Sequence, residues 1–332
     1  MSKETSDWLN RNVLIGMTDK RGNAWHYKAS AQGDEPNHYA GAIPVEDVRR
    51  RLFNWQALEV PMMINTPTGP AEVPNRKAIV RSDNYAVLGV PSSRYVPHQY
   101  DEWLLTNVAH LLDDDLVIGS AGLLAGGGEA WVQVEMPENH RVADVEFRPN
   151  LLATTSFNLS LATTFKRTIT VVVCDNTRAA ALRENSQQVS VRHTAGSIMR
   201  LNEARSALDI VMDISDDFTR EVEMLLEKAI SDAAFGRIVD SMVPVPDDAS
   251  KHKATRSSNL KDSLWNLWRT DHRCAPWKNT GFGVMQVFNT HRQFDRPTRG
   301  GTLQVERTMH EHLTGVTEVV DRKVAQLVLA AV

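Results

Sequence analysis

Residues 116–136 decide the fold, and they read LVIGSAGLLAGGGEAWVQVEM. Two β-rich runs flank the glycines at 126–128, and the second run alternates, with Val132 and Val134 on one side and Gln133 on the other. Such alternation is typical of a strand with one buried face, and the turn predicts an antiparallel hairpin. Adjacent glycines cost backbone entropy, so we expect at least one of the three to have a positive φ. We expect the turn they form to be a flexible surface tip rather than a cradle for a ligand.

The flanking segments extend this hairpin into a sheet. β-Branched runs at 151–160 and 163–173 predict a further strand pair, and Asp175 or Asn176 is expected to cap a helix over 177–184. The sequence shows no βαβ rhythm, which argues against a Rossmann or P-loop domain. The predicted class is α+β: a central antiparallel β-hairpin sheet packed with helices, and a helical C-terminal part.

Three regions are expected along the chain. Residues 1–75 are predicted to be an irregular N-terminal segment with one short helix from Pro44, and residues 76–195 to form the sheet-and-helix core. Residues 196–332 are predicted to be mainly helical, with a basic, aromatic-rich segment. Within them, 244–258 is rich in Pro, Ser and charge and is predicted to be a loop.

The composition favours a reduced, soluble, cytoplasmic protein. The chain has 332 residues, of which 42% are hydrophobic, and no apolar run approaches the roughly 18–20 residues of a membrane span. The N-terminus has no apolar signal region, so we expect no membrane partner. Cys174 and Cys274 belong to no CxxC pair, and we expect both to be free thiols.

Charge is segregated along the chain, although the net charge is only −4. Counting side chains gives −8 for residues 101–150 (two basic, ten acidic) and −8 for 206–248 (three basic, eleven acidic), against +7 for 251–299 (ten basic, three acidic). This partition is compatible with a basic face for a polyanion. It is equally compatible with basic and acidic segments that pair within the fold or between subunits.

Basic residues at two places are candidate nucleic-acid contacts. In the predicted strand at 163–173, Lys166 and Arg167 lie among threonine hydroxyls, which suits phosphate contacts that read no sequence. In the basic segment, aromatic and cationic residues alternate as in single-strand binders, although Trp265 and Trp268 at helical spacing are more typical of a core. The candidate contacts are Lys166, Arg167, Arg178, Arg192, Arg292, Arg296 and Arg299.

Standard catalytic signatures are absent from the sequence. It contains no GxxxxGK[ST], HExxH or GxSxG motif. Asp247, Asp248 and Lys251 resemble a nuclease cluster only loosely, because they fall in a turn-rich stretch, and His310 and His312 are too closely spaced for a helical metal pair. We therefore expect no catalytic residue, no metal and no cofactor.

Several motifs, in order, resemble the phage/plasmid-like protein family, a group carried as a domain of unknown function. The resemblance runs from about residue 25 to the C-terminus and departs at 156–160, where the family tends to carry a Ser-His-Asp-Gly-Ser-like stretch. It implies an origin in a phage or mobile element. In outline the hairpin, sheet and helix are similar to Rad52-like single-strand annealing proteins. The matching motifs include Trp25-His26, Arg81-Ser-Asp83, Leu88-Gly-Val90, Arg94-Tyr-Val-Pro97, Ala121-Gly122, Gly126-Gly-Gly128, Val172-Val-Cys-Asp-Asn-Thr177 and Val191-Arg-His-Thr194.

The leading hypothesis is a non-catalytic protein that binds and anneals single-stranded DNA in recombination, as a homo-oligomer in the bacterial cytoplasm. Annealing needs a basic groove, stacked bases and repeated subunits, but no bond chemistry. A phage nuclease or a host protein is a candidate partner. One alternative function is a phage accessory protein that binds a host protein. The other is a metal-dependent DNA-processing nuclease whose carboxylates come from residues 101–150.

Overall fold

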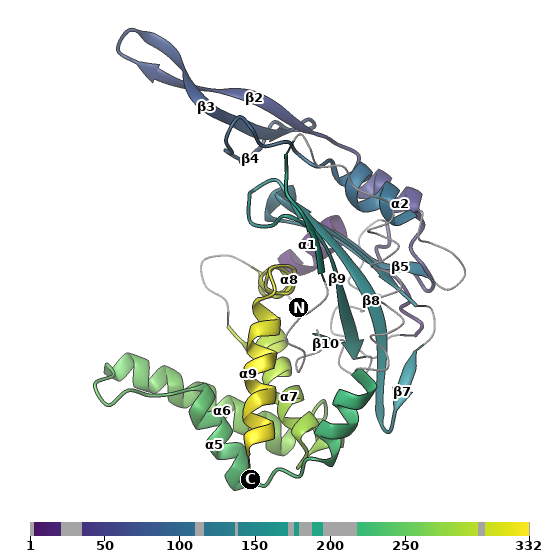
Figure 1. Cartoon of the computed structure of the whole chain (residues 1–332), viewed down its shortest axis with the longest axis vertical. Coiled ribbons are helices and arrows are strands. Elements are labelled where there is room, and N and C mark those ends of the chain that lie inside the picture. Colours follow the sequence, from purple (N-terminus) through teal and green to yellow (C-terminus); the bar gives the residue numbers. More distant parts are fainter. Residues whose placement is uncertain are drawn as a thin grey trace. The chain divides into compact units, whose positions relative to one another are not determined.

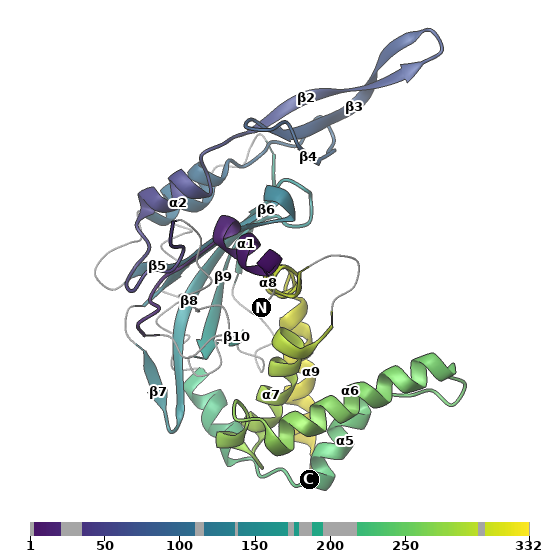
Figure 2. The same cartoon turned by 180° about the vertical axis from the view of Figure 1, so that it is seen from behind.

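The computed structural model divides the chain into two compact units (Figures 1 and 2). The first unit comprises Met1–Glu138, Pro149–Thr168 and Gln187–Met212, and the second comprises Asn139–Arg148, Ile169–Ser186 and Asp213–Val332. The structure describes residues 3–20, 35–109, 116–136, 139–171, 176–178, 188–194, 218–297 and 303–331.

An antiparallel sheet forms the centre of the fold, and together with the helices it confirms the α+β class. The predicted hairpin is present: residues 129–135 of the second strand pair with residues 117–124 of the first. In the part of the chain that is described, the order is β1-β5-β6-β8-β9-β10, with β11 beside β9 and β7 beside β8. The strands are β1 (Val13–Ile15), β5 (Val117–Leu124), β6 (Glu129–Glu135), β7 (His140–Val142), β8 (Val145–Ser156), β9 (Thr163–Val171), β10 (Asn176–Arg178) and β11 (Gln188–Val191).

Both faces of this sheet are buried at its central strands β6 and β8. Val132 lies opposite Ala121 on one side and Ala153 on the other, and these apolar side chains belong to the hydrophobic core of the first unit. On the other face, Gln133 and Glu135 are also buried, so the expectation of a single buried face is wrong. Alternation reports which residues share a face, but it does not report whether the polar face meets solvent.

A three-stranded sheet, in the order β2-β3-β4, makes up a separate part of the first unit (Figure 1). It contains β2 (Ala57–Thr66), β3 (Gly69–Arg81) and β4 (Val87–Gly89), and the long β2–β3 hairpin extends well beyond β4. The expectation that residues 1–75 are irregular is therefore wrong over these strands. Prolines interrupt the apolar alternation there, which hides the strands from a pattern search.

The helices of the first unit are short. The helix predicted from Pro44 is confirmed as α2 (Val45–Arg51), which has acidic residues in its first turn and basic residues in its last. The other helices are α1 (Lys3–Asn12), η2 (Asp101–Thr106), α3 (Asn107–Ala109) and η3 (Ala125–Gly127).

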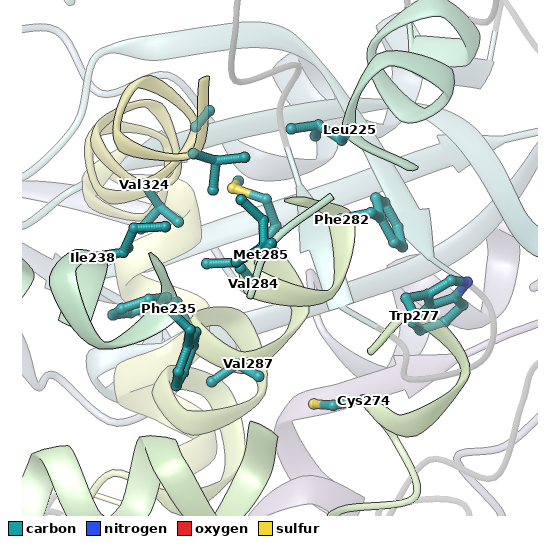
Figure 3. Close-up of a cluster of buried hydrophobic side chains, with 14 of the residues drawn as sticks. Leu225, Phe235, Ile238, Cys274, Trp277, Phe282, Val284, Met285, Val287 and Val324 are labelled. Atoms are coloured by element: carbon teal, nitrogen blue, oxygen red, sulfur yellow. The ribbon is translucent and has the colours of Figure 1, made fainter. Parts of the chain in front are cut away.

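A helical bundle dominates the second unit and surrounds an apolar cluster (Figure 3). All ten residues of α7 (Gly281–Thr290) are buried. Phe235 stacks on Trp268 with ring centroids 4.5 Å apart, which confirms Trp268 as a core residue. Residues 218–227 are also helical. The remaining elements are α5 (Asp232–Met242), α6 (Lys251–Thr270), η4 (Ala275–Trp277), α7 (Gly281–Thr290), η5 (His291–Asp295), α8 (Gln304–Leu313) and α9 (Val316–Ala330).

Two local predictions in this unit are wrong. Asn176–Arg178 form strand β10, paired with β9, instead of the start of a helix; residues 179–187 lie outside the described ranges. The predicted loop at 244–258 ends early, because α6 begins at Lys251 with the Ser250 hydroxyl accepting from the backbone N–H of Lys253. The first turns of α6 have no apolar stripe, so periodicity could not reveal them. Within the described ranges, no helix is long and apolar enough to cross a membrane.

Candidate functional site

Four of the seven predicted contacts come from the central strands. Lys166 lies on β9 opposite Gln188 of β11, and its side chain is buried. Arg192 follows β11 and is exposed. The backbones of Arg167 and Arg178 lie on β9 and β10, and their side chains lie outside the described residues.

The other three predicted contacts belong to the second unit. Arg292 and Arg296 both bind the carboxylate of Glu311, each at 2.9 Å, and Arg299 lies outside the described ranges. An arginine that is already bound to a carboxylate exchanges that partner when it binds a phosphate, so its contribution to anion binding is reduced. The structure therefore brings Arg292 and Arg296 together, but both guanidinium groups are bound to Glu311 of their own chain.

A stack of four aromatic rings lies where two of the resemblance motifs meet. Tyr95 packs on His193, His193 on His98, and His98 on Trp103, with successive ring centroids 4.8, 4.0 and 3.6 Å apart. The backbone joins the same segments, because the N–H of Val96 donates to the carbonyl of His193. The Arg94–Pro97 and Val191–Thr194 motifs therefore converge on one buried cluster of the first unit, which we call the histidine stack (Tyr95, His98, Trp103 and His193).

Threonine hydroxyls link the two histidines. Nδ1 of His98 lies 2.7 Å from the hydroxyl of Thr163, which lies 2.7 Å from that of Thr155, and Nε2 of His193 lies 3.1 Å from Thr155. In the described part of the chain, Nε2 of His98 and Nδ1 of His193 have no hydrogen-bond partner. Burial lowers the pKa of His98 to about 3 and that of His193 to about 4, so both rings are neutral at pH 7.

Side chains from other segments hold the glycine turn at residues 126–128 in place. Gly126 and Gly127 have φ of 65° and 97°, which confirms the predicted positive φ. Gly127 is buried, and its carbonyl accepts from the hydroxyl of Tyr100 at 2.8 Å, so the interpretation as a flexible surface tip is wrong. Arg81 also contacts the turn. Its guanidinium carbon lies 4.0 Å from the ring centroid of Trp55, and the guanidinium donates to the carbonyl of Gly126 at 2.9 Å.

Arg81 also holds an acid. Its guanidinium makes two hydrogen bonds to Asp83, at 2.9 and 2.7 Å, and this contact lowers the pKa of the Asp83 carboxyl. The Arg81–Asp83 and Gly126–Gly128 motifs thus meet in the same place. Arg81 was assigned no role from the sequence, and the only signal for it there was its membership of a matching motif.

A buried carboxylate lies at the base of this turn. Glu129 accepts hydrogen bonds from the amide of Asn158 at 2.9 Å and from the hydroxyl of Ser160 at 2.8 Å. Asn158 and Ser160 lie between β8 and β9, so this segment supplies hydrogen-bond donors to the buried carboxylate of Glu129.

Polar side chains also line the second face of the central sheet. Glu135 packs so closely over Gly119 that a Cβ there would lie 2.0 Å from the carboxyl group. Lys166 and Thr168 lie on the same strand and are buried, and Thr168 donates to the side-chain oxygen of Asn150. Buried polar groups at this density specify a unique packing when all are satisfied. In the described ranges, no group of three or more His, Cys, Asp or Glu could hold a metal ion.

The basic residues in the first turns of α6 differ from Arg292 and Arg296, which are paired with an acid. Lys251, Lys253 and Arg256 are exposed, and in the described part of the chain no acid lies within ion-pair distance of any of them. Farther along, by contrast, Lys261 binds Asp240 at 2.7 Å. We call the three unpaired residues the α6 cation surface; the end of α6 that carries them extends beyond the other helices of its unit (Figures 1 and 2).

Comparison with known proteins gives one match. A family model described as Domain of unknown function (DUF932) matches residues 87–323. The histidine stack, the glycine turn and α6 all fall within the matched residues. No curated protein and no solved structure matches the chain.

Proposed function

We propose that this chain, which belongs to the family of domains of unknown function DUF932, binds and anneals single-stranded DNA without catalysis, in recombination of a phage or mobile element. The α6 cation surface is the observation that carries the proposal. Lys251, Lys253 and Arg256 offer positive charge that no acid of the described chain neutralises. A phosphate backbone supplies the missing anions at regular spacing.

The placement of these cations is electrostatically unfavourable for an isolated helix. Lys253 and Arg256 are three residues apart on one side of α6, where like charges destabilise a helix by about 0.2–0.5 kcal/mol. Lys251 and Lys253 lie in the first turn, and cations there oppose the helix dipole. A bound polyanion relieves both costs, and Thr255 and Ser258 add exposed hydroxyls that can donate to phosphate.

The rest of the proposal comes from the resemblance. The antiparallel sheet with its long hairpins supports the likeness to Rad52-like annealing proteins at the level of outline, and annealing accords with a homo-oligomer in the cytoplasm of a bacterial host. Annealing needs electrostatic neutralisation and repeated subunits, and the α6 cation surface offers the first of these.

Fluorescence anisotropy of labelled single-stranded DNA tests the proposal. We expect binding that is insensitive to sequence, is unchanged by EDTA, and weakens by about 2 log units per log unit of salt, as three phosphate contacts require. The Lys253→Ala/Arg256→Ala variant should lose about tenfold or more in affinity and most of that salt slope. Lys323→Ala, which removes an exposed lysine of α9, is the matched control and should change neither.

Other outcomes assign the function elsewhere. Absence of binding at low salt overturns the proposal and favours an accessory protein that binds a host protein, and Mg²⁺-dependent degradation of the DNA favours a nuclease. The Lys166→Ala/Arg167→Ala variant, measured in parallel, tests the central strands. If only that variant weakens binding, and its circular dichroism matches that of the unmodified chain, the DNA contacts the sheet, and the α6 cation surface plays no part.

A further inference from the structure

The lysines of the α6 cation surface lie on two flanks of one helix face. His252, Arg256 and Asn259 follow the i, i+4, i+7 spacing, so they share one face of α6. Lys251 and Lys253 lie about 100° to either side of His252, because successive residues of an α-helix are rotated by that angle. All five side chains are exposed. The first turns of α6 therefore present a central face with hydrogen-bonding groups and a lysine on each flank.

This arrangement matches the major groove of a DNA duplex. The groove is about 12 Å wide, and an α-helix with its side chains is about 10–12 Å across, so a free helix end fits into it. A helix in the groove has base edges in front of it and a phosphate backbone on each side. The first turns of α6 are such a free end, since they extend beyond the other helices of their unit (Figures 1 and 2).

A single strand matches this surface less well. Single-strand binders combine cations with aromatic side chains on which successive bases stack. Residues 251–264 contain no Phe, Tyr or Trp, and residues 251–261 contain no acid. Between the cations the side chains are small, which lets the helix approach the floor of a groove, and their hydroxyls suit phosphate and base contacts. These small residues are Ala254, Thr255, Ser257 and Ser258.

We propose that the first turns of α6 enter the major groove of duplex DNA. Lys251 and Lys253 then lie along the two phosphate backbones, while Arg256 and Asn259 face the base edges, where arginine and asparagine form paired hydrogen bonds. This inference rests on the proposed function, because it names the form of DNA that the same surface binds. The duplex is the product of annealing, so a protein that binds it stabilises the annealed state.

The Thr255→Trp variant distinguishes the two forms of DNA. Residue 255 is exposed and lies about 60° from His252 around the helix, beside the central face. Threonine and tryptophan have similar helix propensities and no charge, so the change adds bulk alone. Affinity for a short duplex should fall about tenfold or more, because the indole blocks entry into the groove. Affinity for a single strand of the same sequence should stay equal or rise, because the indole stacks on bases.

The matched control is Val319→Trp, which adds an indole at a 68% exposed site of α9 and should change neither affinity. Circular dichroism checks that both variants are folded. If folded Thr255→Trp binds the duplex as tightly as the control does, the inference is overturned.

A duplex with a filled major groove tests the unmodified chain. Glucose attached to 5-hydroxymethylcytosine occupies the major groove and leaves the phosphates unchanged, so affinity should fall about tenfold or more relative to the plain duplex. Equal affinities for the two duplexes overturn the inference and leave the proposed function standing if the single strand is bound. A chain that binds the plain duplex through its major groove but does not bind single strands contradicts the proposed function alone.

Discussion

His98 and His193 stack with their ring centroids 4.0 Å apart and their planes 18° apart. Threonine hydroxyls link one nitrogen of each ring, and each ring has a second nitrogen without a hydrogen-bond partner in the described ranges. When Nδ1 of His98 donates and each threonine hydroxyl passes the hydrogen bond on toward His193, Nε2 of His98 is an acceptor and Nδ1 of His193 is a donor. When the hydrogen bonds run in the opposite direction, these two nitrogens exchange roles. Burial disfavours the charged form of each ring, and two adjacent imidazolium rings would also repel each other, so both histidines are neutral at pH 7.

The histidine stack should make the first unit sensitive to acid. Both pKa values are lowered, to about 3 and about 4 from 6.5, so the unfolded chain binds protons that the folded chain does not. The free energy of unfolding is therefore highest above pH 6.5 and falls as the pH drops toward 4, by about 1.4 kcal/mol per pH unit for each histidine. Below pH 3 these two groups add no further slope.

Denaturant titrations monitored by tryptophan fluorescence between pH 7 and pH 5 measure this slope. The His193→Gln variant cannot be protonated at this position, so its stability should fall less steeply, by about 1.4 kcal/mol per pH unit, than that of the unmodified chain. Equal slopes in the two proteins would contradict the neutral, buried state of His193.

Gly127 should tolerate substitution far less well than its neighbour. A Cβ at Gly127 would lie 2.5 Å from Nη1 of Arg81, at a φ of 97°, whereas one at Gly126 meets nothing within 4 Å, at a φ of 65°. We expect Gly126→Ala to cost about 1 kcal/mol from backbone strain alone, and Gly127→Ala to cost about 2–3 kcal/mol, because Arg81 must also move. Thermal melts of the two variants give the comparison, and equal losses would refute the clamped turn.

The sequence predicts the hairpin of the central sheet because its two signals, strict alternation and a glycine turn, are local. It does not predict that Glu135 and Lys166 are buried, because alternation assigns a residue to a face and says nothing of what covers that face. The histidine stack joins residues 95 positions apart, His98 and His193, and no local pattern encodes that contact. The first turns of α6 escaped prediction for the opposite reason: most of their residues are exposed, so they have no apolar period.

Cys274 should be unreactive in the folded protein. It is a free thiol, as predicted, and it is 2% exposed; Cys174 lies outside the described residues. Burial raises the pKa of the Cys274 thiol to about 12, so almost no thiolate is present at pH 8. Iodoacetamide followed by peptide mass spectrometry should modify Cys274 only after denaturation. Rapid modification in native buffer would show that the helical core opens readily.

Asn158 should be sensitive to the conversion of its amide into a carboxylate. Asn158→Asp replaces the donor to buried Glu129 by a second carboxylate, and two like charges at hydrogen-bond distance destabilise the fold by about 2–4 kcal/mol at pH 7. The pair then holds a proton that the unfolded chain releases, so the loss should shrink as the pH falls toward 4. Ser160→Ala removes another donor to Glu129 without adding charge, so its smaller loss should change little with pH. Melting temperatures of both variants at pH 7 and pH 5 test this prediction. If the loss in melting temperature of Asn158→Asp is the same at both pH values, Glu129 and Asp at position 158 do not share a proton.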